Sequence, residues 1–211
     1  MEETQVKKIP NATAKRLPLY YRNLKFLEEL GTCRINSSEF SKLVQVPSAT
    51  IRKDFSHFGE LGRSGYGYEV SYLISVFSQT LNVKEVTKLA LVGAGNLGKA
   101  LLKNNFRRND DLVITCAFDN NETLSGTTVG EIPIYSMKEL TQQIKKRKIG
   151  TAISTVPSKY SQNAIDLLVN SGVTAILNFA PGRVKVPKHV HVHYIDLTTE
   201  LQTLVYFNEN M

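Results

Sequence analysis

The chain has 211 residues, which is enough for two small domains or one large one. Its hydrophobic content of 42% and charged content of 21% are those of an ordinary globular protein. Residues 1–84 hold 12 Lys and Arg against 8 Asp and Glu, and residues 85–211 hold 14 against 11. The net charge of +7 suits an anionic partner such as DNA, although a charge of this size is more often only a solubility feature.

Cysteine and histidine usage argues against a metal protein or a disulfide-rich protein. Cys33 and Cys116 are far apart and form no C-x-x-C pair, so we expect neither a zinc site nor a disulfide framework. His191 and His193 would share one face of a strand, but no further ligand is evident, and we expect no metal. The start lacks a signal-peptide pattern and no run of about 18 apolar residues exists, so we expect a cytoplasmic protein with no membrane partner.

The first third of the sequence predicts three helices followed by a hairpin. Apolar residues at helical spacing indicate the first helix, and residues 36–39 (NSSE) have the form of a capping box that begins the second. Together these elements, within about 70 residues, favour a winged helix-turn-helix. The predicted elements are helices over residues 13–30, 36 to 43 or 44, and 48–58, and a hairpin over residues 59–68.

One face of the third predicted helix fits the major groove of DNA. If Ile51 lies at the centre of the buried face, Phe55 and Phe58 join it at +4 and +7. The opposite face is then small, polar and cationic, a chemistry that can read guanine and thymine edges. Arg63 of the hairpin would enter a minor groove or bind phosphate. A solvated helix with ordinary charges is the alternative. The predicted DNA-binding residues of this region are Ser48, Ala49, Thr50, Arg52, Lys53, Ser56 and Arg63.

From Lys88 onward, short apolar runs alternate with helical stretches, which predicts an α/β fold with a parallel, doubly wound sheet. The predicted strands cover residues 88–92, 112–118, 149–154, 173–177 and 191–195. The predicted helices cover residues 70–82, 96–106, 136–147, 158–171 and 197–208. We therefore expect a DNA-binding domain with a connecting helix over residues 1–84, a nucleotide-binding domain over residues 85–196, and a C-terminal helical segment over residues 197–211.

Residues 89–98 (LALVGAGNLG) predict a buried strand, a G-x-G-x-x-G turn and the start of a helix, the pattern that holds a dinucleotide pyrophosphate. Asp119 lies 21 residues after Gly98, at the end of the second strand, where its carboxylate suits the adenosine ribose hydroxyls. Because no arginine follows to receive a 2′-phosphate, NAD(H) is favoured over NADP(H). The predicted cofactor-binding residues of the turn are Gly93, Ala94, Gly95, Asn96, Leu97 and Gly98.

Two later turns also follow the ends of predicted strands, where ligands of open α/β sheets bind. Residues 154–157 (STVP) end one apolar run, and residues 178–181 (NFAP) follow the next. A threonine hydroxyl, an asparagine amide and rigid proline turns suit the wall of a nicotinamide or ribose site, although each run is equally consistent with a simple turn. The residues that we add to the predicted cofactor site are Thr155, Val156, Pro157, Asn178, Phe179, Ala180 and Pro181.

Three functions are consistent with these features: a ligand-gated DNA-binding repressor, an NAD-dependent dehydrogenase with an extra helical arm, and a CoA-binding module. We find no separate substrate domain and no convincing pairing of a histidine with an acid for proton transfer, which disfavours an enzyme. The turns at residues 154–157 and 178–182 resemble those of CoA-binding folds, but Asp119 on a ribose argues against that function. We expect a regulator and not an enzyme.

The two halves together resemble the Rex family of redox-sensing bacterial transcriptional repressors. The resemblance spans nearly the whole chain, and it adds Arg16 and Tyr66 to the expected DNA-binding residues. It implies an N-terminal winged helix, a C-terminal Rossmann domain and a homodimer that exchanges its C-terminal helices. The stretches that carry it are residues 14–22, 48–55, 58–62, 65–68, 92–98, 178–181 and 195–201.

The resemblance also implies a function. The family binds palindromic operator DNA near genes of fermentation and NADH reoxidation. NADH, the sensed ligand, releases the repressor, and NAD+ competes without releasing it as effectively, so the protein reports the NADH/NAD+ ratio. Arg22 and Asp196 match an arginine and an aspartate that pair across subunits in the DNA-competent state. From the local sequence alone, Arg22 is a solvated helix residue and Asp196 is a helix cap.

Two positions depart from the family pattern. Asn104 stands where members commonly have a tyrosine that is tied to sensing the nicotinamide state. Ser64 follows Arg63 in the wing, the predicted hairpin over residues 59–68, where family members often have two adjacent basic residues. These departures predict a changed redox response and a changed affinity for DNA.

Overall fold

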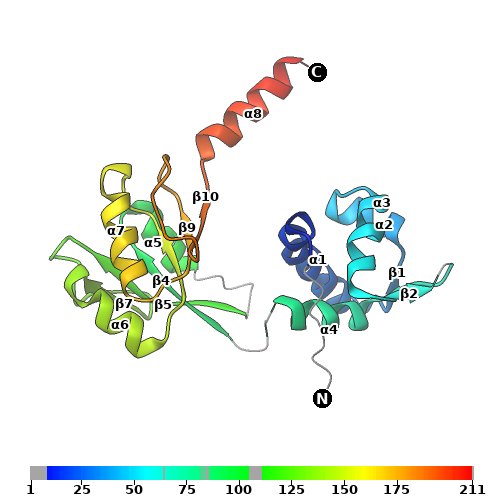
Figure 1. The fold of residues 1–211 in the computed structure, drawn as a ribbon, viewed down its shortest axis with the longest axis horizontal. Coiled ribbons are helices and arrows are strands. Elements are labelled where there is room, and N and C mark those ends of the chain that lie inside the picture. The colour runs from blue at the N-terminus through cyan, green and yellow to red at the C-terminus, as the bar shows by residue number, and fades with distance from the viewer. Residues whose placement is uncertain (1–8, 64, 82, 84–85, 105–110, 211) are drawn as a thin grey trace. The chain divides into compact units, whose positions relative to one another are not determined.

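The structure is a computed structural model, and it describes residues 9–63, 65–81, 83, 86–104 and 111–210. The chain consists of two compact units, Met1–Glu85 and Val86–Met211 (Figure 1). Among the described residues, no helix combines the length and the apolar character needed to cross a membrane.

The first unit has the helices and the hairpin of the predicted winged helix-turn-helix. A short strand, β1, completes a three-stranded antiparallel sheet of order β1-β3-β2. This strand was not predicted, because two residues are too few to show an alternating pattern. The elements are α1 (Asn11–Glu29), β1 (Arg34–Ile35), α2 (Ser37–Val44), α3 (Ser48–Phe55), the 3₁₀ turn η1 (Ser56–Phe58), β2 (Gly62–Arg63), β3 (Gly67–Glu69) and α4 (Val70–Leu81).

Local sequence sets the ends of α2. The Asn36 side chain accepts hydrogen bonds from the backbone amides of Ser38 and Glu39, and the Glu39 side chain accepts one from the Asn36 amide. This is the predicted capping box. The helix ends at Val44, and its C-cap, Gln45, has a left-handed backbone with φ of 56°. Helix α3 begins three residues after Gln45. A short break of this kind joins the two helices of a helix-turn-helix.

An aromatic cluster holds α3 against the rest of the first unit. Phe55 is 2% exposed, and its ring packs edge-on against Tyr20, Tyr68 and Phe77. Such pairs stabilise a core beyond the area that they bury. The helix is shorter than predicted: it ends at Phe55, and a 3₁₀ turn continues to Phe58, whose ring packs on Phe77.

The second unit contains a seven-stranded sheet of order β10-β9-β8-β4-β5-β7-β6, in which every pair is parallel except β6 with β7. This confirms the predicted α/β, doubly wound fold. The elements are β4 (Thr87–Val92), α5 (Asn96–Asn104), β5 (Leu112–Asp119), β6 (Thr128–Val129), β7 (Ile132–Ser136), the 3₁₀ turn η2 (Met137–Glu139), α6 (Leu140–Arg147), β8 (Thr151–Ser154), α7 (Ser158–Asn170), β9 (Ala175–Asn178), β10 (His191–Tyr194) and α8 (Leu197–Asn210).

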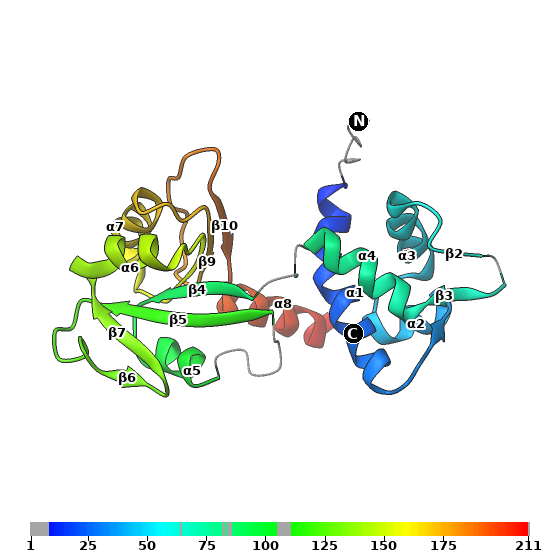
Figure 2. The same ribbon diagram turned by 90° about the horizontal axis from the view of Figure 1, so that it is seen from below.

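Helices cover both faces of this sheet. Leu140 and Ile144 of α6 and Ile165 of α7 pack with one face, and Leu102 of α5 packs with the other. Figure 2 shows α6 and α7 on one side of the strands and α5 on the opposite side. Since the chain runs from β4 outward to β5 and β7, and then back to β8, β9 and β10, the strand order reverses between β4 and β8. Ligands of open α/β sheets bind in the crevice at such a point.

Two predictions for the second unit are corrected, and a third lies partly outside the described residues. Strands β6 and β7 were not predicted, because Pro133 interrupts the short apolar run that forms β7. The helix expected over residues 136–147 begins as a 3₁₀ turn and is α-helical only from Leu140. The described part of α5 ends at Asn104, so the end of the helix expected over residues 96–106 lies outside the described residues. The other strand boundaries agree within two residues.

The last helix, α8, has no covered face within the described chain. Asp196 caps its first turn, since its carboxylate accepts hydrogen bonds from the backbone amides of Thr198 and Thr199 and from the Thr199 hydroxyl. Every side chain from residue 197 to residue 209 is exposed. The large apolar side chains among them are Leu197, Leu201, Leu204, Val205, Tyr206 and Phe207.

Candidate nucleotide site and DNA-recognition surface

The turn at residues 93–98 connects β4 to α5. Gly93 has a φ of +97°, which side chains rarely adopt, and a Cβ added at Gly98 would collide with the carbonyl oxygen of Gly93. At Gly95, by contrast, no atom beyond the sequence neighbours lies within 4 Å of the position that a Cβ would take. Because α5 begins at Asn96, its positive end lies beside this open space. The residues present therefore fit a pyrophosphate group.

Asp119 has a contact that the sequence did not predict. It ends β5, and its Oδ2 accepts a hydrogen bond of 2.6 Å from the Ala94 amide, while its Oδ1 accepts one of 2.7 Å from the Asn121 amide. The carboxylate therefore fixes the glycine-rich turn. Each carboxylate oxygen has a second lone pair, which can still accept a hydrogen bond from a ribose hydroxyl. That contact stays a prediction.

Thr155 joins the turn after β8 to the turn after β4. Its hydroxyl donates a hydrogen bond of 2.6 Å to the Gly93 carbonyl, and its amide donates one of 2.9 Å to the Val92 carbonyl. Val156 also lies against Gly93, since a Cβ added there would be 3.0 Å from the Val156 Cγ1. Pro157, the next residue, is exposed and precedes α7. The Thr155 hydroxyl proton is thus already used within the protein.

Asn178 shapes the turn after β9. Its buried amide group donates to the Ala180 carbonyl at 3.4 Å and accepts from the Ala180 amide at 3.3 Å and the Ser161 hydroxyl at 3.5 Å. Because Asn178 and Ala180 are buried, the groups left to line a ligand are those of the half-buried Phe179 and the exposed Pro181.

Strand register brings the predicted cofactor residues to one end of the sheet. Val92 pairs with Phe118 on one side and with Ser154 on the other, and Ser154 pairs with Asn178. The three predicted turns and Asp119 therefore follow four neighbouring strands in one row. Their contact with a cofactor stays a prediction.

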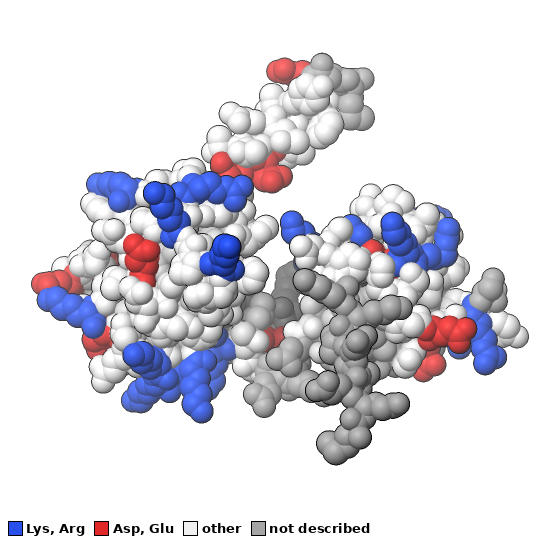
Figure 3. Space-filling model, viewed as in Figure 1, with Lys and Arg blue, Asp and Glu red and all other residues white. Residues whose placement is uncertain are grey.

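The α3 surface has the burial that the sequence predicted. Ile51 and Phe55 are buried, whereas Ala49, Arg52, Lys53 and Ser56 are exposed and Ser48 and Thr50 are half-buried. Arg52 also donates a hydrogen bond of 3.2 Å to the Ser37 hydroxyl of α2. Lys and Arg side chains gather over the part of the first unit where α2 and α3 lie (Figure 3). The face opposite the core is thus exposed, and its contact with a groove of DNA stays a prediction.

A buried aspartate, which the sequence reasoning missed, ties α3 to α1. Asp54 is 2% exposed, and it accepts hydrogen bonds from Thr13 Oγ1 at 2.8 Å, Arg16 Nε at 2.6 Å, Arg16 Nη2 at 2.7 Å and the Tyr20 hydroxyl at 2.7 Å. Burial alone would raise the pKa of the Asp54 carboxyl, but the hydrogen bonds from Arg16, Tyr20 and Thr13 outweigh it and hold that pKa below its usual value.

This network changes the interpretation of Arg16. Two of its guanidinium nitrogens bind Asp54, and its side chain is 30% exposed. Its first role is therefore to connect α1 with α3, and a contact with DNA stays a prediction. The spacing of Thr13, Arg16 and Tyr20 on one face of α1 is the signal that would have revealed a polar partner.

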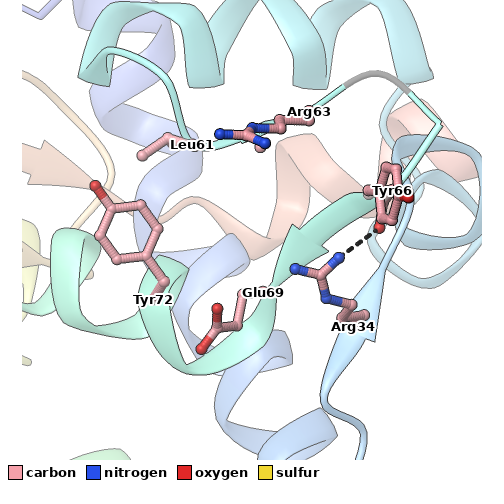
Figure 4. A pocket seen from close by; sticks show the side chains of 8 residues that line it. Arg34, Leu61, Arg63, Tyr66, Glu69 and Tyr72 are labelled. Atoms are coloured by element: carbon pink, nitrogen blue, oxygen red, sulfur yellow. Dashed lines mark hydrogen bonds between the residues drawn. The ribbon is translucent and has the colours of Figure 1, made fainter.

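The wing contains a second arginine that the sequence reasoning did not select. Arg34 of β1 donates a hydrogen bond of 3.2 Å to the Tyr66 carbonyl, and both side chains lie with Arg63 around a hollow beside the hairpin (Figure 4). Tyr66 is 74% exposed and Arg63 is also exposed, so both can reach a partner. Ser64 lies outside the described residues.

The expected switch residues are all at the surface or near it. Arg22 is exposed on α1, Asn104 is exposed at the end of α5, and Asp196 is the half-buried cap of α8. The Thr199 hydroxyl and amide hold the pKa of Asp196 below its usual value. The local interpretation of Asp196 as a cap is thus what the structure shows, and its pairing with Arg22 across subunits stays a prediction.

Both cysteines are free thiols. Burial raises the pKa of Cys116 to about 11, so this thiol is protonated at neutral pH and a poor nucleophile. Within the described ranges, no group of three or more His, Cys, Asp or Glu side chains is arranged to hold a metal ion.

Two family models match parts of the chain. One is described as a putative DNA-binding protein N-terminus and matches residues 8–56. The other is described as a CoA binding domain and matches residues 84–182.

Comparison with solved structures extends the match to nearly the whole chain. A structure described as RSP in complex with β-NAD+ and operator DNA is 31% identical, with a TM-score of 0.87, and the match covers 96% of this chain and 94% of that one. A structure of RSP in complex with β-NADH is 30% identical, with a TM-score of 0.83, and covers 96% and 95%. A further RSP structure is described as a Rex-family repressor.

Relatives of known name are closer still. The redox-sensing transcriptional repressor Rex 2 of Enterococcus faecalis is 63% identical over 96% of this chain and 94% of its own length. The redox-sensing transcriptional repressor Rex of Latilactobacillus sakei is 57% identical over 95% and 97%. With identity of this extent over both units, the chain belongs to the Rex family of redox-sensing transcriptional repressors.

Proposed function

We propose that this protein binds palindromic operator DNA as a homodimer and leaves it when NADH binds at the carboxyl ends of β4 and β8. The observation that supports this most is the presence, in one chain, of an exposed α3 surface and of a turn at residues 93–98 that fits a pyrophosphate. The relatives are named as repressors, and the matching RSP structures hold NAD+ with operator DNA or hold NADH. We therefore propose a cytoplasmic regulator and not an enzyme.

The homodimer is proposed from α8. Six large apolar side chains of this helix are exposed, which is an unusual apolar surface for a monomer. A second copy of the chain, with the same helix, is the partner that the family resemblance implies. A dimer also presents two α3 helices, which matches the two halves of a palindrome.

Release by NADH requires a difference in affinity. NADH changes the binding of DNA only if it binds the DNA-competent state and the released state with different affinities. Simultaneous binding of both subunits to the operator is then lost when the two α3 helices no longer match the spacing of the half-sites. Residues 93–98 and Asp119 would hold the cofactor, and Lys53 and its neighbours would hold DNA.

Fluorescence anisotropy tests the proposal. The full chain is bound to a labelled palindromic duplex at fixed salt and is titrated separately with NADH and with NAD+. We expect release at a much lower concentration of NADH than of NAD+, and the ratio of the two midpoints measures how strongly the protein, with Asn104 in place, discriminates between the two nucleotides. Binding that ignores both nucleotides would overturn the proposed regulation.

Lys53→Ala is expected to weaken operator binding by about 1–3 kcal/mol, because Lys53 is exposed on the face of α3 that would read a base. The affinity is measured with the palindromic duplex and with a random duplex of equal length. Lys146→Ala, an exposed lysine of α6 in the second unit, is the control and should leave both affinities unchanged. An equal loss on both duplexes would make Lys53 a phosphate contact that reads no base.

A further inference from the structure

The loop between β9 and β10, residues 179–190, leaves β9 at its carboxyl end, and β10 then runs parallel to β9 and returns to the same end of the sheet at Tyr194. Asn178 and Tyr194 are register partners in the two parallel strands, and the Ile195 amide donates a hydrogen bond of 2.9 Å to the Asn178 carbonyl. The loop leaves this point through the predicted cofactor residue Phe179, and α8 begins two residues after Ile195. The wall of the cofactor site and the start of α8 are therefore anchored together.

Tyr194 also holds the middle of the loop. Its hydroxyl accepts a hydrogen bond of 3.0 Å from the Val184 amide, and the Arg183 guanidinium lies 4.7 Å from the centre of its ring. The second contact is a cation–π interaction. One half-buried side chain at the end of β10 thus contacts two consecutive loop residues.

The loop is held from α7 as well. Gln162 donates from Nε2 to the Lys185 carbonyl and accepts at Oε1 from the Lys185 amide, both at 2.9 Å. At the beginning of the loop, Asn178 binds both the amide and the carbonyl of Ala180. Because bonds fix residues 180 and 183–185, a shift of the loop would be passed to Tyr194.

The junction after Tyr194 continues this chain of contacts. Ile195 is bonded to Asn178, and Asp196 caps the first turn of α8 through Thr198 and Thr199. A displacement of Tyr194 is thus a displacement of the start of α8, since no free residue separates them.

We propose that Tyr194 is a positioning residue that couples one turn of the predicted cofactor site, residues 178–181, to α8. Ligand contact with Phe179 or Pro181 moves the loop, the loop moves the Tyr194 side chain, and the direction of α8 changes with it. This inference rests on the proposed function, in which α8 joins the two copies and NADH releases the operator. The proposed route from the loop to α8 passes through the hydroxyl and the ring of Tyr194.

The proposal is tested by measuring, in the full chain, how strongly the binding of operator DNA changes the affinity for NADH. NADH affinity is measured alone and in the presence of saturating operator duplex, and the ratio of the two dissociation constants is the coupling factor. Tyr194→Phe removes the acceptor of the Val184 amide and keeps the ring. We expect its NADH affinity without DNA to stay within about threefold of wild type, and its coupling factor to fall by about fivefold or more.

Two further variants keep the test specific. Tyr135→Phe is the matched control, because the Tyr135 hydroxyl accepts a hydrogen bond of 2.8 Å from Arg147 elsewhere in the second unit. It should lose similar stability and keep the wild-type coupling factor. Arg183→Ala removes only the cation over the Tyr194 ring, at an exposed position, and should lower the coupling factor by a smaller amount.

The outcomes separate this inference from the proposed function. If wild type itself has a coupling factor of one, the proposed function fails, and this inference fails with it. If wild type is coupled and Tyr194→Phe is coupled equally, the route through Tyr194 is wrong. If Tyr194→Phe loses NADH affinity and keeps the coupling factor, Tyr194 belongs only to the ligand site, which also overturns the inference.

Discussion

Replacing Asp54 with alanine is expected to lower the free energy of unfolding of the first unit by about 3–5 kcal/mol, the cost of removing the buried carboxylate to which Arg16 and two buried hydroxyls are bound. The variant leaves Arg16 without its partner and removes the acceptor of the buried Thr13 and Tyr20 hydroxyls. Denaturant unfolding of the full chain, followed by circular dichroism, measures the effect. Glu29→Ala, an exposed acid at the end of α1 in the same unit, is the control and should change the stability by less than about 0.5 kcal/mol.

The same site predicts a pH dependence. Because the folded state holds the pKa of Asp54 below its usual value, this carboxylate stabilises the fold fully above about pH 4, the usual value for an unfolded aspartate. The contribution is lost as the pH falls through the lower, folded value. The stability difference between wild type and Asp54→Asn should therefore shrink below about pH 4. An equal difference at neutral pH and in acid would contradict this.

Replacing Gly98 with alanine is expected to lower NADH affinity by at least about 100-fold and to destabilise the second unit by about 1–3 kcal/mol. Its new Cβ collides with the Gly93 carbonyl oxygen, so the turn must open. Calorimetric titration with NADH and thermal unfolding measure the two effects separately.

Two other glycines make this test specific. Gly95→Ala adds a methyl group to open space, so it should keep the stability and lose NADH affinity, since that space is where the phosphates would lie. Gly150→Ala also meets nothing within 4 Å, and it lies away from the turn, so both quantities should be unchanged. Normal NADH binding by Gly95→Ala would show that the pyrophosphate does not approach this turn.

The features that could be predicted from the sequence are the ones that depend on neighbours in the sequence. The capping box needs only Asn36 and Glu39, three residues apart. The glycine-rich turn needs only six consecutive residues after a strand. The carboxyl ends of the strands could also be predicted to meet, because parallel strands share one direction.

The features that could not be predicted depend on partners far away in the sequence. Asp54 binds Arg16, 38 residues away, and Asp119 binds the Ala94 amide, 25 residues away. Neither pairing has a local pattern. The strand β1 is too short to show a period, and its Arg34 gains its place beside the wing only when β1 pairs with β3.

The contact between Asp119 and the glycine-rich turn has a consequence for the speed of sensing. The Asp119 carboxylate binds the Ala94 amide, and the Thr155 hydroxyl binds the Gly93 carbonyl, so groups of the protein itself order the turn. Preorganisation of this kind reduces the entropy that a ligand loses on binding and removes a slow ordering step from association. The occupancy of an ordered binding site changes at a rate that depends on diffusion of the ligand and on its dissociation. The delay between a change in ligand concentration and the response is then set by the conformational change that follows binding.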